Sequence, residues 1–210
     1  GIILFSGSYT TPLSHQFGFQ VDALAAYSMD DLSAGLSGHL FWRDPEDALL
    51  GLYGAYTDRG WPNIDEIGNL ALELELYLDD VTLSGHIGRE FGDRTEIYGI
   101  GLLSWYSESE DSHIYGGAGY QHGLEMIYFG VEYDPKWQAA KNTTLFLNSI
   151  YAGCDETLIH VGVRFYFGAP KSLKVRHRED DPIVTALPGN LLNLDSCGST
   201  AMVGGGGGGL

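Results

Sequence analysis

Acidic side chains at alternate positions could form part of an ion-conducting lining. Glu73 and Glu75 lie two residues apart in an alternating segment, so in a strand both carboxylates would point the same way, about 7 Å apart. Asp22, Glu90 and Glu132 lie on the polar faces of other alternating segments. Carboxylates that ring a pore favour cations. If these segments enclose a common interior, the five acids predict a lumen biased toward cations.

Basic side chains and histidines share the same polar faces, which leaves a second interpretation open. Packed ion pairs could fill a narrow lumen instead of lining a water-filled one, and both can be true along its length. We therefore predict a pore lining and leave its state open. The predicted lining residues are Asp22, His39, Arg43, Glu73, Glu75, His86, Glu90, Glu132 and Arg164.

Catalysis and metal binding find little support in the residue spacing. Ser84, His86 and Glu90 share one strand face, so contact between a serine and a histidine is feasible, but small polar residues are expected on a lumen face anyway. No pair among the seven histidines has a metal-ligand spacing such as H-x3-H. We expect no catalytic residues, no metal site and no cofactor, and we expect that the protein is not an enzyme. A lipid-acting enzyme ranks third among the functions considered.

The positioning elements are predicted to be strands. Residues 69–77 place Leu70, Leu72, Leu74 and Leu76 on one face, whereas a helix would scatter them. Similar alternation, punctuated by turn residues, predicts an antiparallel all-β architecture. The predicted strands are Ile2–Thr10, Phe17–Ser28, Ala34–Arg43, Leu49–Thr57, Glu66–Tyr77, Val81–Phe91, Glu96–Ser107, Ser112–Gln121, Leu124–Tyr133, Thr143–Ala152 and Thr157–Phe167.

The length of these strands favours a transmembrane β-barrel over a soluble sandwich. Strands in soluble proteins usually run about 5–6 residues, whereas strands that cross a bilayer run about 9–11. One face of each strand is apolar and the other polar, as lipid on one side and a lumen on the other require. Aromatic residues gather near strand ends, which is typical of interfacial girdles. They are Tyr27, Trp42, Tyr56, Phe91, Trp105, Tyr133, Tyr151, Phe165 and Phe167.

Composition excludes several other classes. The 210 residues carry 28 acidic and 11 basic side chains, a formal net charge of -17, so a basic face for nucleic acid is not expected. Two cysteines exclude a disulfide scaffold, and no apolar run approaches the roughly 20 residues of a membrane helix. The charge divides the chain. Residues 1–167 hold the whole acidic excess and form the predicted barrel, and residues 168–210 form a largely irregular extension with a Gly-rich end.

The last predicted strand resembles the C-terminal assembly signal of bacterial outer-membrane β-barrel proteins. His160, Gly162, Phe165 and Phe167 match the positions of that signal. The resemblance implies targeting to the outer membrane of a Gram-negative bacterium, contact with outer-membrane lipid and recognition by the barrel-assembly machinery. Two departures are that 43 residues follow Phe167 and that Gly1–Thr10 contains no signal-peptide pattern, so we expect a mature chain or a fragment.

The wider sequence is similar to small porin-like outer-membrane proteins, a mostly uncharacterised family. The segments that carry this impression are 12–22, 41–45 and 176–182. Single-chain bacterial barrels have even strand counts, whereas the pattern predicts eleven. We therefore expect a barrel of eleven or twelve strands, with a first strand missing before Gly1 favoured over a miscount.

These observations predict a porin-like channel for passive diffusion of small polar solutes or cations. The alternative is a non-conducting structural or surface-interaction barrel whose loops make the contacts. The sequence gives no solute and no oligomeric state.

Overall fold

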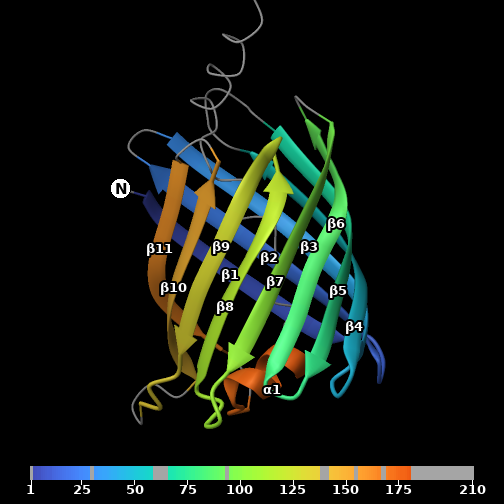
Figure 1. Cartoon of the computed structure of the whole chain (residues 1–210), viewed down its shortest axis with the longest axis vertical. Coiled ribbons are helices and arrows are strands. Elements are labelled where there is room, and N and C mark those ends of the chain that lie inside the picture. Colours follow the sequence, from blue (N-terminus) through green and yellow to red (C-terminus); the bar gives the residue numbers. More distant parts are fainter. Residues whose placement is uncertain are drawn as a thin grey trace, which may run out of the picture.

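The described part of the protein is an antiparallel sheet of eleven strands with one short helix (Figure 1). The computed structural model describes residues 2–28, 31–58, 66–92, 95–137, 142–153, 156–166 and 169–180, to which all statements below refer. The elements are β1 (Ile2–Pro12), β2 (Phe17–Ser28), β3 (Asp31–Asp44), β4 (Ala48–Asp58), β5 (Glu66–Leu78), β6 (Val81–Gly92), β7 (Glu96–Tyr106), β8 (Ser112–Gln121), β9 (Leu124–Tyr133), β10 (Thr143–Ala152), β11 (Glu156–Phe165) and α1 (Leu173–Glu179).

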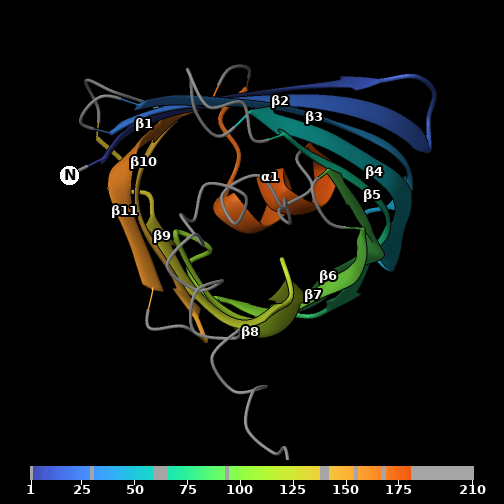
Figure 2. The ribbon, with the colours of Figure 1, turned by 90° about the horizontal axis from the view of Figure 1, so that it is seen from above.

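Every strand pairs with its neighbours in chain order, so the sheet is a run of antiparallel hairpins. Figure 2 shows the sheet curling around a central space, with its edges β1 and β11 on the same side of the molecule. No ladder joins β1 to β11 among the described residues. The prediction of an all-β antiparallel barrel is confirmed, at eleven strands, and the expected twelfth strand stays a prediction.

The distribution of apolar side chains is inverted relative to a soluble protein. In β5 the side chains alternate strictly: Leu72 is 56% exposed on the convex face, and its neighbour Glu73 is 3% exposed on the concave face. Leucine, isoleucine and phenylalanine side chains are exposed along most of the other strands as well. Such a surface is costly in water and favourable in lipid, so the convex face is the membrane-facing one.

Aromatic side chains form a belt near each end of the barrel. The odd-numbered strands finish at the end that holds α1, here termed the α1 end, and the even-numbered strands finish at the far end. Trp42, Trp105, Tyr133 and Phe165 lie near the α1 end, and Tyr27, Tyr56, Phe91 and Tyr151 near the far end. All are exposed except the half-buried Trp42. Phe167 lies outside the described residues.

A charge on the convex face tests which solvent this face meets. Leu72→Arg, midway along β5, is expected to lower the free energy of unfolding from lipid vesicles by about 2–4 kcal/mol, because arginine at the bilayer midplane is that costly. Leu78→Arg, at the end of the same strand, is the matched control, with an expected loss of at most ~1 kcal/mol. Urea titration followed by tryptophan fluorescence measures both, and equal losses would contradict a membrane-spanning β5.

The packing of the final strand, β11, explains why a glycine stands at position 162, one of the positions that match the assembly signal. His160 and Gly162 point inward, and Phe165 points outward with 64% of its surface exposed. A Cβ at Gly162 would lie 2.7 Å from Cζ of Phe146 on β10, so the ring packs where a side chain would stand. Recognition of this strand by the assembly machinery stays a prediction.

The extension beyond the barrel contains a helix that its mixed charge did not predict. Ser172 caps α1, because its Oγ accepts a hydrogen bond from the backbone N of Val175 at 3.3 Å. No helix among the described residues is long and apolar enough to span a membrane.

Candidate functional site: the lumen and the helix at its mouth

A buried charge network on the concave face joins β2, β3 and β5, and it reaches across β4. The His39 ring lies between two carboxylates, with Nδ1 2.6 Å from Oε2 of Glu73 and Nε2 2.9 Å from Oδ2 of Asp22. Gln20 and Ser37 each donate to Asp22 at 2.8 Å. Only an imidazolium donates from both ring nitrogens, so one positive charge on His39 bridges two negative ones.

The other predicted lining residues of β3, β5 and β6 are also buried and engaged. Glu75 accepts the hydroxyl hydrogen of Tyr77 at 2.9 Å, and the guanidinium of Arg43 lies 4.5 Å from the centre of the Phe41 ring. Glu90 accepts from the backbone N of His122 at 2.7 Å. His86 Nε2 lies 3.6 Å from Glu73. Each of these groups has a neighbour on the concave face, and Glu90 reaches the turn between β8 and β9.

A second cluster surrounds Glu132 on the opposite wall, near the α1 end. Its Oε2 accepts from Nη1 of Arg164 at 2.7 Å. Its Oε1 accepts from Thr144 at 2.5 Å and from the hydroxyl of Tyr166 at 2.7 Å. Glu132 is 4% exposed, and these three donors fix its carboxylate in the lumen.

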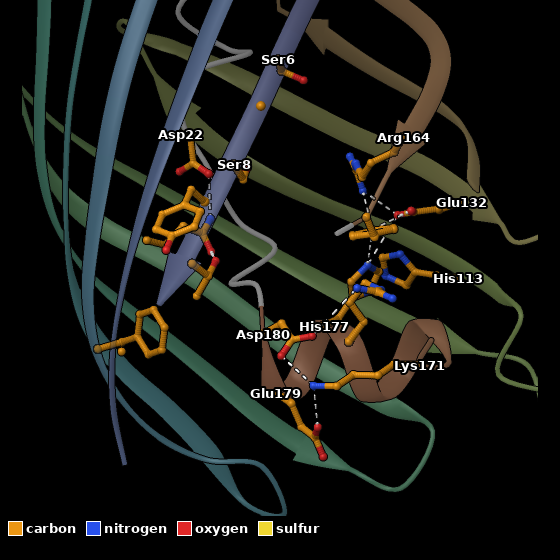
Figure 3. A pocket seen from close by; sticks show the side chains of 18 of the residues that line it. Ser6, Ser8, Asp22, His113, Glu132, Arg164, Lys171, His177, Glu179 and Asp180 are labelled. Atoms are coloured by element: carbon orange, nitrogen blue, oxygen red, sulfur yellow. Dashed lines mark hydrogen bonds and ion pairs between the residues drawn. The ribbon is translucent and has the colours of Figure 1, made fainter. Parts of the chain in front are cut away.

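A cavity of about 920 Å³ lies between strands β1–β3, strands β7–β11 and α1 (Figure 3). Four of the nine predicted lining residues border it: Asp22, Arg43, Glu132 and Arg164. The other five lie on the concave face away from it. Helix α1 and its flanks add Lys171, Arg176, Glu179 and Asp180 to its border, so basic and acidic side chains are equally numerous there.

Helix α1 lies inside the outline of the barrel, across its mouth (Figure 2). Lys174 reaches Asp80 at 2.8 Å and Glu110 at 3.5 Å. Arg178 donates to the carbonyl of Val81 at 2.9 Å, and its guanidinium lies 5.0 Å from the centre of the Tyr77 ring. The helix is therefore held on the wall by basic side chains that meet carboxylates, a carbonyl and an aromatic ring.

The loop between β7 and β8 anchors the start of α1. The backbone N of Leu173 donates to the carbonyl of Glu110 at 3.0 Å, and Ser172 donates to the Glu110 carboxylate at 2.5 Å. The loop itself is braced by Asp111, which accepts from Ser109 at 2.6 Å. That hydrogen bond from Ser109 holds the pKa of Asp111 below its usual value.

Apolar packing on the concave face is the feature that charge patterning missed. Ten buried side chains of β4, β5, β7, β9, β10 and β11 form one cluster. They are Tyr53, Ala71, Tyr98, Ile100, Leu102, Met126, Tyr128, Ile150, Ala152 and Leu158. The concave face is thus polar in some regions and tightly packed in others.

The structure also brings together residues that spacing could not connect. His113 on β8 lies beside His177 of α1, with ring centres 4.9 Å apart, and both lie beside Glu132. A contact between the barrel wall and the extension leaves no local spacing signal.

Comparison with solved structures identifies the architecture. The KdgM porin in complex with disordered oligogalacturonate superposes with a TM-score of 0.62 at 14% identity, over 79% of this chain and 92% of that chain. The fold is that of a small porin barrel. KdgM porin in a second structure gives a TM-score of 0.61 at the same identity and coverage.

A third solved structure belongs to work on the mechanism of in-meso crystallization of membrane proteins. Its TM-score is 0.53 at 13% identity, over 84% of this chain and 87% of that chain. No protein-family model and no curated protein sequence matches. The expected resemblance to outer-membrane β-barrel proteins is therefore confirmed at the level of the fold.

Proposed function

We propose that this protein is a porin-like barrel of a Gram-negative outer membrane, through whose lumen small polar solutes diffuse. The observation that carries the proposal is an inverted barrel, with leucines outside, whose interior holds a mixed-charge cavity of about 920 Å³. Lipid satisfies the convex face, and a polar interior needs either water or complete internal pairing. The porin fold supports the first of these.

The charges on the cavity argue for weak charge selectivity. Glu73, Glu75 and Glu90 lie off the cavity border, and Glu73 is paired with His39. The remaining lining acids, Asp22 and Glu132, are matched by Arg43 and Arg164. We therefore expect neutral sugars and small ions of either sign to pass. KdgM porin was captured with oligogalacturonate, which makes a saccharide the first solute to test.

Planar-bilayer recording of the refolded full-length protein tests the proposal. We expect discrete conductance steps and a reversal potential close to zero across a KCl gradient. A strongly cation-selective reversal potential would instead support the prediction from the sequence that the five acidic residues bias the lumen toward cations. Folding is verified by heat-dependent mobility on a denaturing gel. If the folded protein gives no conductance steps at all, the proposal of a channel is wrong.

A non-conducting barrel is the second candidate, because two observations favour it. The apolar cluster between Tyr53 and Leu158 fills part of the concave face, and α1 lies across one mouth. In that case the surface loops would carry the function by contacting other molecules. Flux of a small sugar into liposomes separates the candidates, since a sealed barrel lets none enter.

A further inference from the structure

We propose that His113, Glu132 and His177 form a binding site for a first-row divalent cation such as Zn²⁺, which ties α1 to the barrel wall. One donor atom from each residue lies within 4.8 Å of the others. His113 and Glu132 stand directly opposite each other on paired strands β8 and β9. His177 comes from α1, so a bound ion would join the helix to the wall.

The unpaired ring of His113 is the observation that points to a ligand. The side chain is 1% exposed, and neither ring nitrogen has a hydrogen-bond partner among the described residues. A buried polar group without a partner costs about 1–3 kcal/mol, so such a group in a native protein calls for an explanation. Its ring stacks against Tyr106 at 4.8 Å between centres, and it meets the His177 ring edge-on. Figure 3 shows both rings directed into the same space beside Glu132.

The second ligand is already oriented for coordination. Nε2 of His177 lies 3.5 Å from Oε2 of Glu132, close to the roughly 3.4 Å that separates two ligand atoms of a tetrahedral zinc ion at about 2.1 Å each. Nδ1 of His177 lies 3.1 Å from the hydroxyl of Tyr106, and Nε2 lies 3.2 Å from the hydroxyl of Tyr166, a contact that a bound ion would replace. With an ion on Nε2, Nδ1 would carry the hydrogen and donate it to the Tyr106 hydroxyl, as metal-bound histidines donate to outer-sphere partners.

The hydrogen bonds to the Glu132 carboxylate leave one of its lone pairs available for a metal ion. Thr144 and Tyr166 occupy Oε1 of Glu132, and Arg164 occupies one direction at Oε2. A carboxylate oxygen has two lone pairs, so Oε2 can accept from Arg164 and still face His177. The guanidinium opposes the charge of a bound cation, which argues for moderate affinity.

The donor set selects the class of ion. Two imidazoles and one carboxylate suit zinc, cobalt, nickel or copper, whereas calcium and magnesium prefer oxygen ligands. All three residues border the 920 Å³ cavity, which provides an entry path and room for water as a fourth ligand.

Metal binding by the refolded full-length protein in detergent tests the site. After chelator treatment we expect the chain to bind one Zn²⁺, and Co²⁺ in its place to give the visible absorption of a tetrahedral site. Loss of an outer-sphere partner alone costs about 10–100-fold in metal affinity. His113→Gln and His177→Gln are therefore each expected to weaken Zn²⁺ binding by at least ~100-fold. Excess Ca²⁺ is expected not to compete.

The matched control is His15→Ala, which removes an exposed turn histidine and is expected to leave binding unchanged. His177 lies on α1 rather than on a barrel strand, so His177→Gln leaves the residues of every strand ladder unchanged. Wild-type protein that binds no Zn²⁺, or a His177→Gln variant that binds with wild-type affinity, would overturn the proposal.

Trypsin supplies an independent readout of where the ion acts. Lys174, Arg176 and Arg178 lie within α1, so Zn²⁺ is expected to slow cleavage there in the wild type and not in His113→Gln. Protection of equal size in both proteins would show that the ion does not bridge the helix and the wall.

Discussion

A barrel carrying Lys174→Glu together with Arg178→Glu is expected to conduct severalfold more current than the parent protein. Lys174 meets the carboxylates of Asp80 and Glu110, and Arg178 meets the carbonyl of Val81. Glutamate at position 174 would repel the carboxylates of Asp80 and Glu110, and glutamate at position 178 would leave the carbonyl of Val81 without its donor. Helix α1 should then leave the mouth, which it crosses in Figure 2.

Single-channel recording measures this effect, and trypsin reports whether α1 has been released. Lys136→Glu is the control, since Lys136 lies in the loop after β9 and pairs with Asp111 at 3.5 Å rather than with the helix. Its conductance should match that of the parent. If trypsin removes α1 from the double variant and the current stays the same, the helix does not restrict the lumen, and the apolar cluster becomes the closing element.

The strands could be predicted from the sequence because lipid imposes a strict two-residue period. Leu70, Leu72, Leu74 and Leu76 must all face the bilayer, and any slip by one residue would put Glu73 and Glu75 there. Exposing polar side chains to lipid would cost much free energy at every strand, so the alternation of apolar and polar residues is clear along the chain. The prediction differed mainly at strand ends, where β3 begins at Asp31 and β1 continues to Pro12, beyond the alternating residues.

The helix could not be predicted by the same argument. The sequence of α1, LKVRHRE, has too few apolar residues for a hydrophobic face, and helices this short have little stability of their own. What buries Arg176, His177 and Arg178 is the wall of tyrosines and carboxylates that the barrel presents. Burial of basic residues by long-range partners follows no hydropathy rule, and the cluster of His113 with His177 was missed for the same reason.

The nine lining residues were placed on the concave face by alternation alone, but their partners were not. Period two fixes which face a side chain occupies. It does not say that His39 lies between Asp22 and Glu73, because that contact depends on the register of β2, β3 and β5. Whether these residues line a conducting path stays a prediction for the bilayer experiment.

Replacing His39 by leucine is expected to destabilise the barrel by about 3–5 kcal/mol, the usual cost of removing one partner from a buried charge network. The ring is 1% exposed, and its nitrogens contact Glu73 at 2.6 Å and Asp22 at 2.9 Å. Without it, two carboxylates face each other in the interior with no positive charge between them. Denaturant unfolding in lipid vesicles measures the loss.

The triple variant His39→Leu, Asp22→Asn, Glu73→Gln separates lost charge pairing from lost packing. It removes the uncompensated charges and keeps the size of each side chain, and neutral replacements of whole buried ion pairs are often tolerated. Gln20 and Ser37 can still hydrogen-bond the amide at position 22. We expect the triple variant to recover most of the loss. A triple variant as unstable as His39→Leu would mean that the imidazole acts through its shape. The carboxylates beside it would then be solvated by water in an open lumen and would not need its charge.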